Sequence, residues 1–173
     1  MFVGPRSLRC LCGALALAAP GVAAAAAPVT GSAGAQLGVL SPVSVIKKTD
    51  LNFGTVVTAA TAGTVVLNPV NGTVTTTGGL TAAGTGAHAA VFTSTGSKNS
   101  VVHIRLPTGA TTLTRVGGTE TVTASTWTLD GSANQRIPAN QTFDFAVGAT
   151  LSVSAAQVAG TYVGTFLITV QYP

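Results

Sequence analysis

The stretch that decides the fold is residues 161–172, which read TYVGTFLITVQY. Large apolar or aromatic side chains recur on one side of its two-residue alternation, namely Tyr162, Phe166, Ile168, Val170 and Tyr172. The positions between them are more polar. Because successive side chains of a β-strand point to opposite faces, this alternation predicts a strand with one face on the core. We expect the five side chains to form part of a core between two sheets.

Working outward from this stretch, short runs of β-branched residues recur from residue 43 onward, separated by Gly, Asn, Asp or Pro. The clearest runs are residues 43–47, 64–67, 73–77, 90–95, 101–106, 121–129, 142–147 and 150–154. Asn71-Gly72 predicts a tight hairpin turn between two of them. Residues 76–87, rich in Gly, Ala and Thr, are expected to form a mobile loop. No helical spacing of apolar residues occurs, so the sequence predicts an all-β sandwich or barrel.

The composition excludes several functional classes. Only 7% of the residues are charged, so the charged side chains that usually cover exposed helices are scarce and a helical protein is disfavoured. The chain also has no cluster of cations to neutralise the phosphates of a nucleic acid. The two histidines, His88 and His103, and four scattered carboxylates form no ligand or catalytic motif, and no G-x-S-x-G signature occurs. We therefore expect no enzymatic activity, no catalytic residue, no cofactor and no metal site.

The first 27 residues have the organisation of an export signal. Arg6 and Arg9 precede a short apolar run, residues 11–19, and small residues at 25–27 supply an A-x-A cleavage site. The apolar run is shorter than the roughly 20 residues that a membrane span requires. We expect cleavage after Ala27, an N-terminal extension or first strand over residues 28–42, and a β-sandwich domain over residues 43–173. The mature chain would carry no membrane span and would reside in the periplasm, at the cell surface or outside the cell.

Two parts of the chain carry a family resemblance. Residues 50–56, DLNFGTV, and the C-terminal runs 147–151, 159–166 and 170–172 resemble a family of secreted bacterial domains of unknown function. Those domains are in turn similar to the immunoglobulin-like subunits of chaperone–usher fimbriae and to spore-coat protein U. The resemblance covers about residues 40–172. It implies an incomplete immunoglobulin-like sandwich that is completed by the N-terminal strand of a neighbour.

The segment before the domain contains a candidate for such a donated strand. Its alternate positions are Ala33, Ala35, Leu37 and Val39. An alternating segment suits strand addition, because main-chain hydrogen bonds supply affinity and every second side chain fills a groove. The alternative is that residues 36–40 form the first strand of their own domain.

Two functions from different classes follow. The first is a non-enzymatic structural subunit of a surface fibre or coat, whose partners would be further copies or related subunits, a periplasmic chaperone and an usher. The second is a free or cell-surface binding module for a protein or glycan, with its site in the loops at one end of the sandwich. Trp127, Tyr162 and Tyr172 are the main aromatic candidates for stacking on sugars, and all three are expected in the core.

Overall fold

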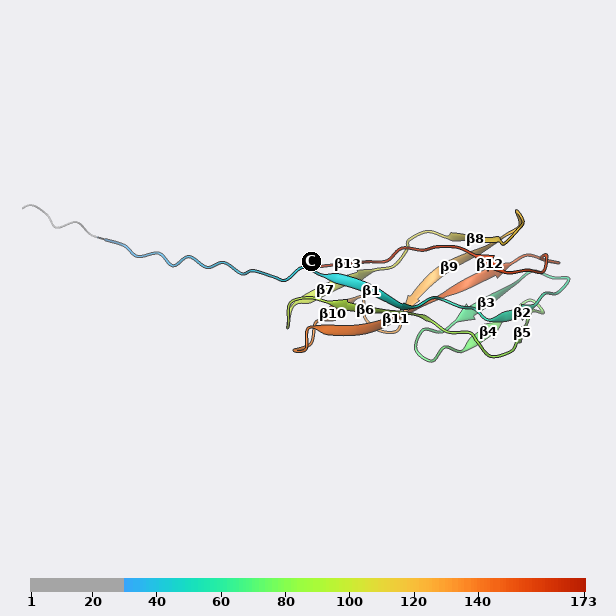
Figure 1. The fold of residues 1–173 in the computed structure, drawn as a ribbon, viewed down its shortest axis with the longest axis horizontal. Coiled ribbons are helices and arrows are strands. Elements are labelled where there is room, and N and C mark those ends of the chain that lie inside the picture. The colour runs from blue at the N-terminus through green and yellow to red at the C-terminus, as the bar shows by residue number, and fades with distance from the viewer. Residues whose placement is uncertain (1–29) are drawn as a thin grey trace, which may run out of the picture. The chain divides into compact units, whose positions relative to one another are not determined.

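The computed structural model describes residues 30–173, and every regular element in this part of the chain is a β-strand (Figure 1). The strands are β1 (Ser44–Thr49), β2 (Thr55–Val57), β3 (Gly63–Leu67), β4 (Val74–Thr76), β5 (Thr81–Ala83), β6 (Ala90–Thr95), β7 (Val101–Arg105), β8 (Thr111–Arg115), β9 (Thr121–Leu129), β10 (Asn134–Arg136), β11 (Thr142–Val153), β12 (Tyr162–Val163) and β13 (Thr169–Gln171). The predicted all-β class is confirmed. The chain divides into two units, Met1–Leu37 and Gly38–Pro173, and all the strands belong to the second.

The strands form three sheets. The largest has eight strands in the order β1-β6-β11-β9-β8-β12, with β3 added beside the second half of β11 and β4 beside β3. A second sheet has the order β10-β7-β13, and a third consists of β2 and β5. All the pairings are antiparallel. This arrangement follows from the short β-branched runs, which meet across tight turns such as Asn71-Gly72 between β3 and β4.

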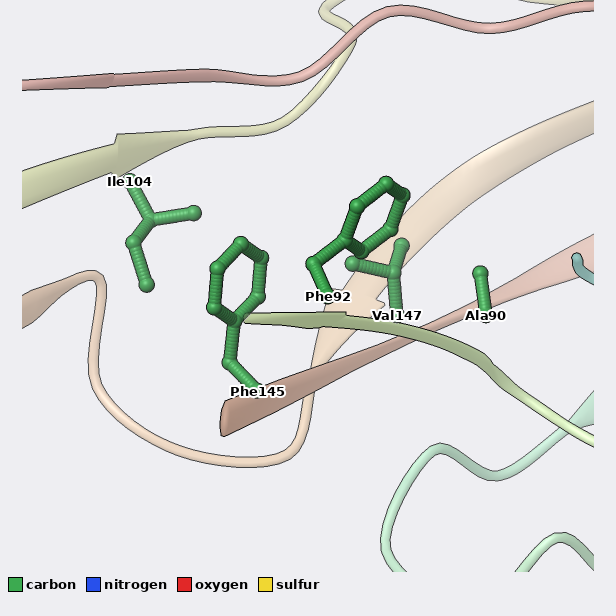
Figure 2. Packing of buried hydrophobic residues seen from close by; sticks show 5 residues of the cluster. All are labelled: Ala90, Phe92, Ile104, Phe145 and Val147. Atoms are coloured by element: carbon green, nitrogen blue, oxygen red, sulfur yellow. The ribbon is translucent and has the colours of Figure 1, made fainter. Parts of the chain in front are cut away.

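The main core joins the eight-stranded and three-stranded sheets. Phe92 of β6 stacks on Phe145 of β11 with ring centroids 5.5 Å apart, and Ala90 and Val147 extend the same cluster. Ile104 of β7 contributes from the opposite sheet, and Figure 2 shows it pointing toward the side chains that rise from β6 and β11. Period-two alternation explains this cluster, because each of these strands places its apolar side chains on one face.

A smaller core corrects the expectation for residues 76–87. That stretch is not simply a loop: it contains β5, which pairs with β2, and it carries Leu80, which is only 5% exposed. Leu80 packs with Val65 of β3 and Val153 of β11. Leu80 is the only large apolar side chain in the stretch, and its burial, worth roughly 1.5–3 kcal/mol, adds to the pairing of β5 with β2 in ordering the segment.

Residues 142–147 and 150–154 were expected as separate strands, and the structure instead has one long strand, β11. The pairing of β11 with β9 shifts in register between Gly148 and Thr150. A side chain at Gly148 would lie 2.3 Å from the carbonyl oxygen of Leu67, so only glycine allows this close approach of two strands. The glycine that looked like a strand terminator therefore sits inside a bulged strand.

The expectation of one continuous strand over residues 161–172 is wrong, because the strand is interrupted. The structure has β12 and β13 separated by residues 164–168, which are outside any ladder. Opposite them, residues 106–110 connect β7 to β8 and contain Pro107, which has no N–H to donate to a ladder. The alternation of faces nevertheless persists through the gap, since Phe166 and Ile168 are half-buried while Thr165 and Leu167 are exposed.

Candidate functional site

An apolar groove of about 540 Å³ lies between residues 51–58 and residues 157–162. Its floor comes from the inward faces of three strands of the large sheet: Leu113 of β8, Val122 of β9, and Leu151 and Val153 of β11. Core side chains are thus accessible from outside at this place. We refer to this hollow as the acceptor groove.

The strands on the two sides of the acceptor groove each have an unpaired edge. Within residues 30–173, β2 pairs only with β5, and β12 pairs only with β8. A strand edge without a partner exposes backbone N–H and C=O groups that can pair with another chain. Apolar floor and open edges together are the features that a groove for an added strand requires.

Polar contacts fix the wall of the groove at Tyr162. Its hydroxyl donates to the carbonyl oxygen of Val158 at 2.6 Å and accepts from Nε2 of Gln157 at 2.7 Å. Gln157 also donates to the carbonyl oxygen of Thr121 at 3.3 Å. Tyr162 therefore presents its ring to the groove while its hydroxyl is engaged at the rim.

The rest of the predicted core face of the last strand lies along the main cluster. Phe166, Ile168 and Val170 all pack against it. The ring of Phe166 lies 4.5 Å from that of Trp127 and 6.3 Å from that of Phe92, between centroids. Trp127 donates its indole N–H to the carbonyl oxygen of Gly109 at 3.2 Å. Trp127 is therefore engaged with Phe166, at an angle of 33° between the rings, and with the backbone at Gly109.

Tyr172, the last of the five, has a role that the sequence did not reveal. Its hydroxyl donates to the carbonyl oxygen of Ser41 at 2.8 Å and accepts from the backbone N–H of Ser97 at 2.7 Å. Ser41 in turn donates its N–H to the hydroxyl of Ser97 at 2.6 Å. These bonds hold the start of the domain to its last residues. In Figure 1 this place, beside β13, lies at the opposite end of the second unit from β2 and β12.

The candidate donor residues lie before the first strand. Residues 30–43 contain no strand, and β1 begins at Ser44. Leu37 is 89% exposed and Val39 is 82% exposed, and both alanines of the predicted set, Ala33 and Ala35, are exposed as well. The boundary between the two units falls directly after Leu37.

Within residues 30–173 three ion pairs form: Lys47 with Asp50, Lys48 with Asp144, and Arg115 with Glu120. None of these six residues lines the groove. The hydrogen bonds from Arg115, with Nε to Oε2 at 2.6 Å, lower the pKa of Glu120 to about 2. Bonds from Lys48 and from the hydroxyl of Thr93 likewise lower the pKa of Asp144.

The two histidines lie in separate environments. His88 forms a backbone bridge with Asn52, and Nδ1 of His103 lies 2.7 Å from Oδ1 of Asn134. Within residues 30–173 no group of three His, Cys, Asp or Glu side chains is placed to hold a metal ion. In the same part of the chain no helix is long and apolar enough to cross a membrane.

Comparison with known families gives one match. Residues 43–172 match the model of DUF4402, a domain of unknown function. The chain belongs to the DUF4402 family. This confirms the expected membership in a family of unknown function, and it does not extend to fimbrial subunits or to spore-coat protein U. No curated protein and no solved structure shows a significant match to the chain.

Sequence reasoning alone did not find the acceptor groove. Four of its lining residues, Thr55 to Thr58, overlap and follow the DLNFGTV motif in a β-branched run too short to stand out as a strand. The available signal was the motif itself, which places two large apolar residues, Leu51 and Phe53, beside a glycine with φ of 78°. A positive φ of this kind favours glycine, which has no Cβ to clash.

Proposed function

We propose that this DUF4402 protein is an exported, non-enzymatic structural subunit of a bacterial surface fibre or coat, assembled by strand addition between copies. The observation that carries the proposal is the acceptor groove, an apolar hollow bordered by two strand edges without partners. A strand supplied by a second copy would pair with those edges and cover Leu113, Leu151 and Val153.

The strand order supports an immunoglobulin-like sandwich in which no strand of residues 30–173 fills the position of strand G. In the constant-type immunoglobulin fold one sheet has the order A-B-E-D and the other C-F-G. The order β1-β6-β11-β9 matches the first sheet, with β7 as strand C and β12 and β13 as the two ends of strand F. Within residues 30–173 no strand pairs with the outer edge of β12 or of β13. The position of strand G, beside strand F, includes the edge of β12 at the acceptor groove.

The two ends of the second unit support a head-to-tail assembly. The donor segment joins the domain at the end held by Tyr172, and the acceptor groove lies at the other end (Figure 1). Repetition of a heterologous contact of this kind produces a filament when its rotation does not close into a ring.

Export is the part of the proposal that depends on residues 1–29, which lie outside the described residues. The charge, apolar run and A-x-A site carry it. Mass spectrometry of the exported protein should give a chain that begins near Pro28. Recovery of a form that still begins at Met1 from the cell envelope would refute export with cleavage.

The assembly is tested by charge substitution in the donor segment. In the double variant Leu37→Asp/Val39→Asp, two carboxylates would have to enter an apolar groove, which is costly without partners. The matched control, Gln36→Asp/Gly38→Asp, places the same charges at the alternate positions. Light scattering after size-exclusion chromatography should show polymers for the wild type and the control, and folded monomers for the Leu37/Val39 variant. Monomers in all three proteins at high concentration, with any co-encoded chaperone and usher present, would exclude strand addition.

Disulfide trapping tests the site of insertion directly. Both cysteines of the chain, Cys10 and Cys12, lie in the expected signal peptide, so the mature protein offers a cysteine-free background. Cysteines placed at Leu37 and at Ala159 in the groove should form intermolecular disulfides, as should the pair at Val39 and Ala159. Gln36→Cys with Ala159→Cys is the control, because its side chain would face away from the groove. Equal crosslinking in all three pairs would indicate random collision instead of an ordered strand.

The competing proposal of a glycan-binding module gains no support from the aromatic residues. The ring of Trp127 packs against that of Phe166, and the hydroxyls of Tyr162 and Tyr172 are both hydrogen-bonded within the domain. If the Leu37→Asp/Val39→Asp variant unfolds, Leu37 and Val39 belong to the fold of their own domain and do not form a donated strand.

A further inference from the structure

The six cations of the expected mature chain divide into two groups. Lys47, Lys48 and Arg115 are each paired with a carboxylate. The other three are Lys98, Arg105 and Arg136, and within residues 30–173 none of them forms an ion pair. All three of these cations are exposed, and all lie on or beside β7 and β10 of the three-stranded sheet.

Strand register places the two arginines on the same outer face. Val102 and Ile104 of β7 are buried, so Val101, His103 and Arg105 point away from the core. Arg136 of β10 is directly opposite Val101, and opposite residues in an antiparallel pair point to the same side. Arg105 lies four residues along β7 from Val101, the partner of Arg136. This spacing along the strand corresponds to roughly 13 Å.

The connection between β6 and β7 brings Lys98 to the same end as Arg136. The N–H of Asn99 donates to the carbonyl oxygen of Ile137, and the N–H of Ile137 donates to that of Ser100, both at 2.8 Å. Ile137 is fully buried and directly follows Arg136. The loop that carries Lys98 is therefore fixed by hydrogen bonds next to the second arginine.

Neutral polar groups occupy the space between the cations. His103 has Asn134 on one side, at 2.7 Å, and Gln171 of β13 on the other. Thr169 lies opposite Arg105. We call this surface, formed by Lys98, Val101, His103, Arg105, Asn134, Arg136, Thr169 and Gln171, the basic face. The nearest carboxylate in sequence to β10 is Asp130, which forms no ion pair within residues 30–173.

We infer that the basic face binds an acidic polysaccharide. Charge complementarity indicates a polyanion, since three uncompensated cations share one surface of a chain in which the other three are neutralised. The amide and hydroxyl groups between them can exchange hydrogen bonds with sugar hydroxyls, and guanidinium groups match carboxylates in bidentate geometry. A single-stranded nucleic acid would also require aromatic platforms for its bases. The residues of this face include no Phe, Tyr or Trp.

This inference goes beyond the proposed assembly and does not rest on it, because the basic face belongs to the domain alone. The test is calorimetric titration of the mature protein with polygalacturonate at low ionic strength, repeated at increasing salt. The double variant Arg105→Gln/Arg136→Gln removes two charges from the face. The matched control, Lys47→Gln/Lys48→Gln, removes the same net charge from ion-paired positions on β1.

We expect the wild type to bind polygalacturonate, with affinity that falls as salt rises. The arginine variant should bind about tenfold more weakly or worse, while the lysine control should stay within about twofold of the wild type. Equal losses in both variants would show that only net charge matters, and would overturn the assignment of the face. So would absence of binding by the wild type, equal binding of neutral dextran, or tighter binding of oligo(dT) than of polygalacturonate.

Discussion

Replacing Phe166 with alanine is the most direct test of how the last strand faces the core. Phe166 lies in the gap between β12 and β13, where no ladder holds the backbone, so its position depends on packing. Its ring contacts Trp127 and Phe92 and packs against the main cluster. The substitution would remove both aromatic contacts and leave a cavity beside Trp127.

The expected cost can be worked from these contacts. Truncation of a fully buried Phe costs about 3–5 kcal/mol, and each aromatic pair contributes about 0.5–1.5 kcal/mol beyond the area that it buries. Because Phe166 is half-buried, we expect the lower end of this range, about 3 kcal/mol. With a urea m-value of about 2 kcal/mol/M, the unfolding midpoint should fall by about 1.5 M.

Leu167→Ala is the matched control, since Leu167 is adjacent, apolar and 82% exposed. A surface truncation of this kind should change stability by no more than about 0.5 kcal/mol, or about 0.25 M in the midpoint. Both variants and the wild type should be unfolded in urea and followed by tryptophan fluorescence, which reports on Trp127 itself. Equal midpoints for the two variants would refute the assignment of faces.

Two further predictions concern local features. Thr126 is a β-branched residue with φ of 49° at the bulge between β9 and β11, a conformation that costs about 1–2 kcal/mol. Thr126→Gly should therefore raise stability by about 0.5–1 kcal/mol in thermal unfolding. Thr128→Gly on the same strand should lower stability by about that amount. Loss of stability in both variants would show that the backbone at Thr126 is not strained. Glu120, whose pKa is lowered to about 2 by Arg115, stabilises the folded state above the unfolded pKa near 4.5 and loses this contribution as pH falls toward 2. The wild type should exceed Glu120→Gln in melting temperature at pH 6, with a gap that closes by about pH 2, and a constant gap would argue against the ion pair as its cause.

The sequence by itself determined the fold class and the facing of individual strands. Phe143, Phe145 and Val147 alternate with more polar residues, and the structure places them in or against the main core. Such facing is a local property, because successive side chains of any strand point to opposite sides. The bounds of β6 and β9 follow equally directly from their β-branched runs.

Only the tertiary structure decided where the strands meet and what they leave uncovered. The acceptor groove combines residues 51–58 with Leu113, Val122 and Tyr162, which are separated by long stretches of chain. The strands β2 and β5 have only three residues each and are held by pairing with each other, while Leu80 directly before β5 packs in the smaller core. Strand formation depends on non-local partners, so a three-residue segment carries no signal of its own.

The basic face shows the same division. The sequence shows six cations without a cluster, and nothing in it indicates that Lys98, Arg105 and Arg136 share a surface. Their convergence depends on the register of β10 against β7 and on the hydrogen bonds of Ile137 to the preceding loop. Register is fixed by which residues are buried on the inner face, here Val102 and Ile104, and burial is a property of the packed sheets. The physical reason is that a cluster of exposed charges and an unpaired strand edge are both properties of a surface. A surface exists only after distant segments of the chain have packed.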